Sequence, residues 1–182
     1  DGEEMVDWVL SAYESDPLLP YPVLLVLGPF MQPEARARFA KRASQLDRVD
    51  TITFDPHLES LMTHAAGVVA MGGYNTFCEI LSFDKRALII PREKPRLEQR
   101  IRASKALELG LANVLLDDGI RDPAKMAAAL RSMPKQNLPS EVVVPGLLEG
   151  LYNVNRRMTP WLHRAGEASA NNRTLHKLMD EA

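Results

Sequence analysis

Short aliphatic runs alternate with helical stripes along most of the chain. The runs Val23–Leu27 and Gly67–Met71 are five residues long, and each is followed by glycine. Uninterrupted apolar runs of this length are typical of strands that are buried on both faces of a parallel sheet. The same reasoning predicts further short strands over Val49–Phe54, Ala87–Ile90 and Asn113–Leu116.

Between these strands, apolar side chains recur every three or four residues, which predicts amphipathic helices. The helices are expected over residues 1–15, 33–46, 58–65, 74–82, 97–109 and from 123 onward. Asp122 would cap the last helix, and Gly110 would end the one before it. The alternation predicts an α/β fold with a Rossmann-like open parallel sheet and helices on both faces. Ligands of such sheets bind beyond the carboxyl ends of the strands.

The chain after residue 133 departs from this alternation. Residues 134–145 are punctuated by proline and have little periodicity, which indicates a linker. Beyond them lies a helical stripe made of Leu147, Leu151, Val154 and Met158. The predicted organisation is a domain over residues 1–133, a linker over 134–145, and a C-terminal helix and tail over 146–182.

Composition and charge exclude several classes of protein. The 182 residues include 22 Lys and Arg and 24 Asp and Glu, so the formal net charge is −2. This balance gives no electrostatic reason to expect a nucleic-acid partner. The single cysteine, Cys78, excludes an intrachain disulfide and fits a reducing, cytoplasmic location. The chain starts with Asp1 rather than Met, so we expect it to be a piece of a longer protein.

The sharpest local signal for chemistry follows the strand that ends at Met71. Gly72 and Gly73 open a helix, and such a backbone can approach an anion closely at the helix N-terminus. Thr76 adds a hydroxyl in the first turn, and the Glu79 carboxylate could accept hydrogen bonds from a ribose diol. The alternative is a plain strand-to-helix turn capped by Asn75 or Thr76. On pattern alone we favour that alternative, because short glycine motifs have low specificity.

Other candidate residues carry less information. Five Lys and Arg side chains lie between Arg92 and Arg102 and could face phosphate, but for most of them a solvated helix face is the better interpretation. His57 and His64 are two helix turns apart without further ligands, so we expect exposed histidines and no metal site. Cys78 is expected to be buried and inert. Trp161 lies among arginines and could touch a membrane surface, although packing onto protein is preferred.

Together, two of these segments resemble a known family. The pattern strand-Gly-Gly-x-x-Thr-x-x-Glu-x-Leu is followed by strand-Pro, Glu-Gln-x-x-x-Ala and helix-Gly. It resembles the donor-binding C-terminal half of GT-B glycosyltransferases. The family 28 C-terminal domain, typified by the GlcNAc transferase of peptidoglycan lipid intermediates, is the most similar. The resemblance covers roughly Val23 to Met133.

The resemblance implies roles for the residues of the glycine motif. Gly73 and Thr76, with the adjoining Gly72 and Asn75, match the loop and helix start that hold the nucleotide diphosphate. Glu79 matches the acid that binds the ribose hydroxyls.

The resemblance also implies roles for three other loops. Gln99 matches the glutamine that contacts the donor sugar, and Phe54-Asp55 match the loop whose backbone meets the base edge, usually uracil. Gly28 matches the end of a glycine-rich loop near the phosphates. Here the sequence departs from the family, because Pro29 follows and lacks an N–H that could meet a phosphate.

The function implied is the donor-binding half of a hexosyl or N-acetylhexosaminyl transferase. A UDP-sugar would be the substrate, without a metal or other cofactor, and a missing N-terminal domain would supply the acceptor site and the catalytic base. We expect this fragment alone to be inactive and to self-associate, and to be cytoplasmic, with membrane association as a further option. Two alternatives stay open: a UDP-GlcNAc 2-epimerase-like enzyme, and a non-catalytic donor-binding subunit that needs a partner chain.

Overall fold

The structure is a computed structural model that describes residues 2–142, 144–146 and 149–161. The chain divides into two units, Asp1–Val142 and Val143–Ala182. In the second unit, residues 150–161 are helical.

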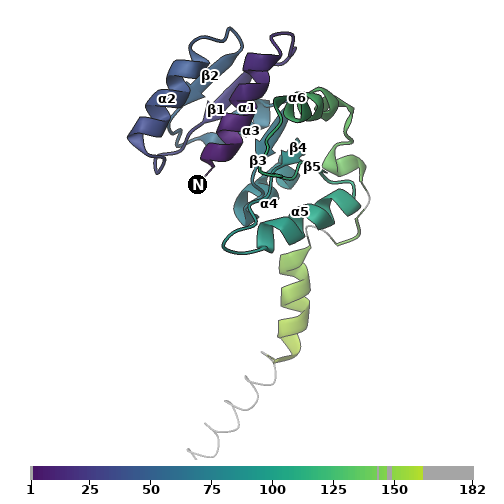
Figure 1. Cartoon of the computed structure of the whole chain (residues 1–182). Helices are drawn as coiled ribbons and strands as arrows, with labels where there is room; N and C mark the ends of the chain where they lie inside the picture. Colours follow the sequence, from purple (N-terminus) through teal and green to yellow (C-terminus); the bar gives the residue numbers. More distant parts are fainter. Residues whose placement is uncertain (1, 143, 147–148, 162–182) are drawn as a thin grey trace, which may run out of the picture. The chain divides into compact units, whose positions relative to one another are not determined.

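The first unit alternates strands and helices, as the sequence predicts (Figure 1). Its strands are β1 (Val23–Val26), β2 (Val49–Ile52), β3 (Gly67–Ala70), β4 (Arg86–Ile89) and β5 (Asn113–Val114). Its helices are α1 (Glu3–Ser15), α2 (Pro33–Ala43), α3 (Leu58–His64), α4 (Tyr74–Ser82), α5 (Glu98–Glu108) and α6 (Pro123–Ser132). Two short 3-10 helices follow, η1 (Met133–Lys135) and η2 (Pro139–Glu141). The α/β fold is confirmed.

Every strand pairing is parallel, but the strands form two sheets. The sheet β1-β2 places Val23 opposite Val49, and the sheet β3-β4-β5 places Leu88 of β4 opposite Asn113. We expected one continuous sheet. Instead β1 and β3 each pair along one edge only, and side-chain packing joins the two sheets. Leu25 of β1 belongs to the same buried cluster as Leu88.

Helices α1 and α6 pack against each other and contribute to this shared core. Trp8 of α1 and Met126 of α6 are almost completely buried, as is Phe39 of α2. The Trp8 indole N–H donates a 2.8 Å hydrogen bond to the carbonyl of Asp122, at the start of α6. The Asp122 carboxylate in turn accepts from the backbone N–H of Ala124, so the predicted cap is confirmed.

Residues 134–142, which we expected in a linker, belong to the first unit. The Gln136 carbonyl accepts a 2.8 Å hydrogen bond from Arg86 Nε, and its side-chain oxygen accepts from the N–H of Ala87. The Asp84 carboxylate accepts from both the N–H and the hydroxyl of Ser140. These contacts hold the segment against the start of β4, so its prolines begin short helical turns in a packed segment.

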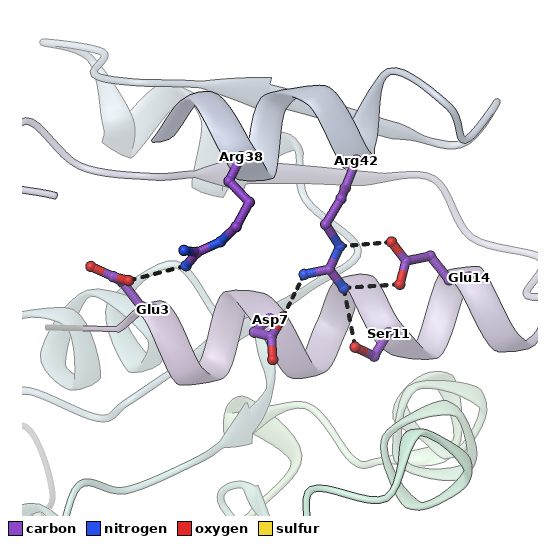
Figure 2. A network of polar contacts seen from close by, with 6 residues as sticks. All are labelled: Glu3, Asp7, Ser11, Glu14, Arg38 and Arg42. Carbon is purple, nitrogen blue, oxygen red and sulfur yellow. Dashed lines mark hydrogen bonds and ion pairs between the residues drawn. The ribbon is translucent and has the colours of Figure 1, made fainter. Parts of the chain in front are cut away.

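A set of polar and charged side chains connects α1 to α2 (Figure 2). We call it the α1–α2 brace; its members are Glu3, Asp7, Ser11, Glu14, Arg38 and Arg42. Arg42 donates from Nε and Nη2 to the two carboxylate oxygens of Glu14, at 2.7 and 2.9 Å. It also contacts Asp7 and donates to the Ser11 hydroxyl. Hydrogen bonding to Glu14 is the main cause that raises the pKa of Arg42, Asp7 adds to it, and desolvation opposes both.

Candidate functional site

Three residues connect the carboxyl end of β3 to α4, and we call them the glycine loop: Met71, Gly72 and Gly73. Gly72 is buried and has a φ of +76°, where L side chains are strained. A Cβ at this position would lie 2.8 Å from Cγ2 of Ile89. The fold itself therefore requires glycine at position 72.

Gly73 is glycine for a different reason. It precedes α4 with a φ of −53°, which any residue can adopt. A Cβ built on Gly73 would meet nothing within 4 Å, so the space beside it is open. The absence of a side chain here leaves the backbone accessible from outside the fold.

Helix α4 begins without a side-chain cap. Its first helical hydrogen bond runs from the N–H of Phe77 to the carbonyl of Gly73, at 2.9 Å. Among the described residues, neither Asn75 nor Thr76 makes a side-chain hydrogen bond, so the capping alternative is not what the structure contains. The first N–H groups of α4 therefore have no partner within the helix, which is the arrangement that attracts anions.

Glu79 lies one turn further along α4 and is half-buried. Residues three apart lie on the same side of a helix, so Glu79 and Thr76 share a side of α4. Neither Glu79 nor Thr76 has a hydrogen-bond or ion-pair partner in the part of the chain that the structure describes. Both side chains are thus available to a ligand at the carboxyl end of β3.

Arg102 of α5 reaches the glycine loop, a role that the sequence interpretation missed. Its Nη1 donates a 2.7 Å hydrogen bond to the carbonyl of Gly72. Its guanidinium also lies over the Tyr74 ring, 5.6 Å from the ring centre. Arg102 is therefore an exception to the solvated helix face that we favour for most of these side chains. A solvated helix face fits Arg100, which forms an ion pair with the exposed Glu93.

Gln99 lies three residues before Arg102, and therefore on the same side of α5. Its side-chain oxygen accepts a 3.0 Å hydrogen bond from the N–H of Arg92, in the loop between β4 and α5. This contact holds the amide in place, and within the described residues its Nε2 has no acceptor. Contact with a donor sugar through Nε2 stays a prediction.

The remaining predicted residues follow β1 and β2. Phe54 is 64% exposed just after β2. The Asp55 carboxylate accepts a 2.7 Å hydrogen bond from the N–H of His57, so Asp55 forms the turn before α3, which begins at Leu58. Gly28, two residues after β1, has a φ of +82° and open space beside it. Among the described residues, no hydrogen bond joins these loops to the glycine loop.

Several expectations about reactive side chains can be compared with the structure. His57 and His64 are exposed, as expected, and Cys78 is half-buried rather than buried. Across the residues the structure describes, no cluster of three or more His, Cys, Asp or Glu side chains is arranged to hold a metal ion. None of the helices in the described part is long and apolar enough to cross a membrane.

The sequence model of the glycosyltransferase family 28 C-terminal domain matches residues 3–141, from the start of α1 to the end of η2. The chain belongs to this family. The match extends beyond the region of the recognised motifs at both ends. No curated protein sequence matches the chain.

Two solved glycosyltransferase structures have a similar fold. The crystal structure of CalG4, the calicheamicin glycosyltransferase, has a TM-score of 0.56 and 19% identity over 71% of this chain and 31% of that one. The glycotransferase of kitacinnamycin has a TM-score of 0.54 and 18% identity over 82% of this chain and 34% of that one. The fold is thus the C-terminal half of a GT-B glycosyltransferase. The family 28 chain spans about a third of the length of these two structures.

Proposed function

We propose that this chain is the donor-binding half of a glycosyltransferase and that it binds a UDP-sugar. One observation carries the proposal: α4 begins uncapped behind a glycine with open space, and Thr76 and Glu79 lie unpartnered on one side of the helix. The chain's membership of the glycosyltransferase family 28 C-terminal domain supports this proposal.

The diphosphate of the donor would lie against the start of α4. The unpaired N–H groups of Gly73 and the first turn can donate to phosphate oxygens, and the helix dipole favours the negative charge. The Thr76 hydroxyl can donate a further hydrogen bond. The N–H groups are fixed by the backbone before a ligand binds, so they need little reorganisation during the reaction.

The other parts of the UDP-sugar are assigned to protein groups that can still form hydrogen bonds. An ionised Glu79 accepts hydrogen bonds only, and ribose hydroxyls can donate two of them. The Nε2 of Gln99 can donate to a hydroxyl of the sugar. The exposed loop at Phe54 and Asp55 would meet the edge of the base, with uracil proposed from the resemblance.

In the proposed reaction, an acceptor hydroxyl attacks the anomeric carbon of the sugar. The new carbon–oxygen bond forms as the bond to the diphosphate oxygen breaks, and the diphosphate leaves with the electron pair. The N–H groups at the start of α4 would stabilise the charge that develops on it. The acceptor proton goes to a base on an acceptor-binding domain, which we propose as the partner of this chain. The sugar would be a hexose or an N-acetylhexosamine.

Isothermal titration calorimetry with UDP, ADP, GDP and uridine tests the donor assignment. We expect UDP to bind more tightly than ADP and GDP, and Glu79→Gln to weaken UDP binding about tenfold or more, because it replaces an ionised acceptor. Glu108→Gln, on the exposed surface of α5, is the matched control and should leave the affinity unchanged. No heat of binding with millimolar UDP would contradict the proposal.

Independence from metal is a separate prediction. We expect EDTA to leave the UDP affinity unchanged, because the proposed contacts to the diphosphate are backbone N–H groups and a hydroxyl. A loss of binding in EDTA that Mg²⁺ restores would show that a metal is needed. No observation on the described residues favours a UDP-GlcNAc 2-epimerase-like reaction over sugar transfer.

A further inference from the structure

Arg102 joins α5 to the glycine loop through the backbone. Its Nη1 lies 2.7 Å from the carbonyl oxygen of Gly72, and its guanidinium packs over the ring of Tyr74. The two contacts are on either side of Gly73. Arg102 therefore fixes the orientation of the peptide group that links Gly72 to Gly73.

The orientation of this peptide determines where the N–H of Gly73 points. A trans peptide is planar, and its C=O and N–H point in opposite directions. Because the Gly72 carbonyl points to Arg102, the N–H of Gly73 points away from it. No acceptor in the described part of the chain takes that N–H, and the space beside Gly73 is open.

The charge of Arg102 is also not neutralised by a neighbouring carboxylate. Among the described residues, Arg42 and Arg100 form ion pairs, whereas the contacts of Arg102 are a carbonyl and an aromatic ring. A cation that hydrogen-bonds to a carbonyl polarises the whole peptide group, and hydrogen bonds linked in this way strengthen one another. The N–H of Gly73 thus becomes a better donor to an anion.

We propose that Arg102 is a positioning residue for the donor diphosphate: it orients and polarises the Gly72–Gly73 peptide so that the N–H of Gly73 binds a phosphate oxygen. This inference rests on the proposed donor site. It adds a residue that acts through the backbone from the opposite side of the loop, without touching the ligand.

Variants of the 182-residue chain separate this role from a general charge effect. Arg102→Gln removes the charge, and Lys105→Gln removes a charge from the exposed surface of the same helix. We expect Arg102→Gln to weaken UDP binding about tenfold or more and to leave uridine binding within twofold, because uridine has no phosphate. Lys105→Gln should leave both affinities unchanged. Arg102→Lys keeps the charge and can still donate a hydrogen bond, so it should recover part of the lost affinity.

The amide resonance of Gly73 gives a readout that a structural role alone would not change. In the wild-type protein, UDP should shift the Gly73 amide proton strongly, and in Arg102→Gln the shift should be much smaller. Circular dichroism establishes that each variant is folded. If Arg102→Gln does not fold, the role of Arg102 is tested with Arg102→Lys instead. This variant should bind UDP at least threefold more weakly than wild type.

The outcomes distinguish this inference from the proposed function. If the wild-type chain binds UDP and folded Arg102→Gln binds it equally well, the role of Arg102 is wrong and the donor site stands. If Arg102→Gln does not fold and Arg102→Lys binds UDP as tightly as wild type, the role of Arg102 is likewise wrong and the donor site stands. If the wild-type chain does not bind UDP, both the donor site and the role of Arg102 are wrong.

Discussion

Two arginines in this molecule each connect a helix to another element, and they differ in what they contact. Arg42 in the α1–α2 brace contacts Asp7 and Glu14, so its charge is compensated by carboxylates (Figure 2). Arg102 contacts the Gly72 carbonyl and the Tyr74 ring, and no carboxylate pairs with it among the described residues. Both arginines stabilise a local arrangement, but only the second leaves positive charge next to an open backbone N–H. The group that an arginine contacts therefore decides its role here. Arg42, paired with carboxylates, holds two helices together, whereas Arg102, without a carboxylate partner among the described residues, lies beside a candidate anion site.

The same contrast appears between the two glycines of the glycine loop. Gly72 is required by its positive φ and by the side chain of Ile89, so it serves the fold. Gly73 has a φ that any residue can adopt and no side chain close to it, so the fold does not require glycine there. Its lack of a side chain leaves space for a ligand. This pair can be tested with one kind of substitution at two adjacent positions.

The largest effect is expected for Gly72→Ala. The methyl group would be strained at a φ of +76° and would overlap Ile89 at 2.8 Å. Strain and overpacking each cost about 1–3 kcal/mol, so the free energy of unfolding should fall by about 2–6 kcal/mol. Urea denaturation followed by circular dichroism measures this. A variant as stable as wild type would show that the loop geometry differs from the one described.

A smaller loss of stability is expected for Arg42→Gln. It leaves Asp7 and Glu14 without their cation, and we expect a loss of about 1–2 kcal/mol after allowance for the exposure of the carboxylates. Arg38→Gln is the control, because its exposed pair with Glu3 should contribute less than about 1 kcal/mol. UDP binding should be unchanged in both variants. A loss of UDP binding in Arg42→Gln would contradict this and indicate that the α1–α2 brace takes part in UDP binding.

Gly73→Ala should have the opposite result to Gly72→Ala. The backbone at Gly73 suits alanine and its methyl group meets no atom, so stability should stay within about 0.5 kcal/mol of wild type. The methyl group would occupy the space where the phosphate approaches, and UDP affinity should fall about tenfold. Calorimetry on both variants tests the comparison. Unchanged UDP affinity in Gly73→Ala would show that the phosphate does not occupy the open space beside Gly73.

The smallest effect concerns Asp118, in the turn that precedes α6. Lys125 first, and then the N–H groups of Arg121 and Ile120, lower the pKa of the Asp118 carboxyl from 3.8 to about 2. A lowered folded-state pKa adds stability that is present above about pH 4 and is lost as the pH falls towards 2. Asp118→Asn should therefore flatten the stability profile slightly in this range. Chemical denaturation at pH 2.5 and 5 measures the change, and an identical pH dependence in both proteins would contradict this interpretation.

The sequence was sufficient for the features that depend on local pattern. The bounds of α4 follow from its stripe and the preceding glycines, and those of β3 differ from the prediction by one residue. The helix cap at Asp122 was also predictable from the sequence, because its hydrogen bond joins residues only two positions apart. Local periodicity and turn chemistry determine these elements.

Contacts between distant segments were not predictable in the same way. Gln136 holds a supposed linker against β4, and Arg102 reaches a carbonyl thirty residues earlier in the chain. Both depend on tertiary packing, which a pattern of polar residues does not specify. The packing of Leu25 and Leu88 in one buried cluster, which links the two sheets, is also a contact between distant segments. One signal could have indicated Arg102: its spacing of three residues from Gln99 places both on one side of α5.

The central claim is that a nucleoside diphosphate binds at the start of α4. Titration of the ¹⁵N-labelled chain with UDP, followed by amide resonances, tests it most directly. The account predicts that the amides of Gly73, Tyr74 and Asn75 shift the most and that those of Asp7 and Ser11 in the α1–α2 brace do not move. A set of shifts centred on the brace, or no shifts at millimolar UDP, would contradict it.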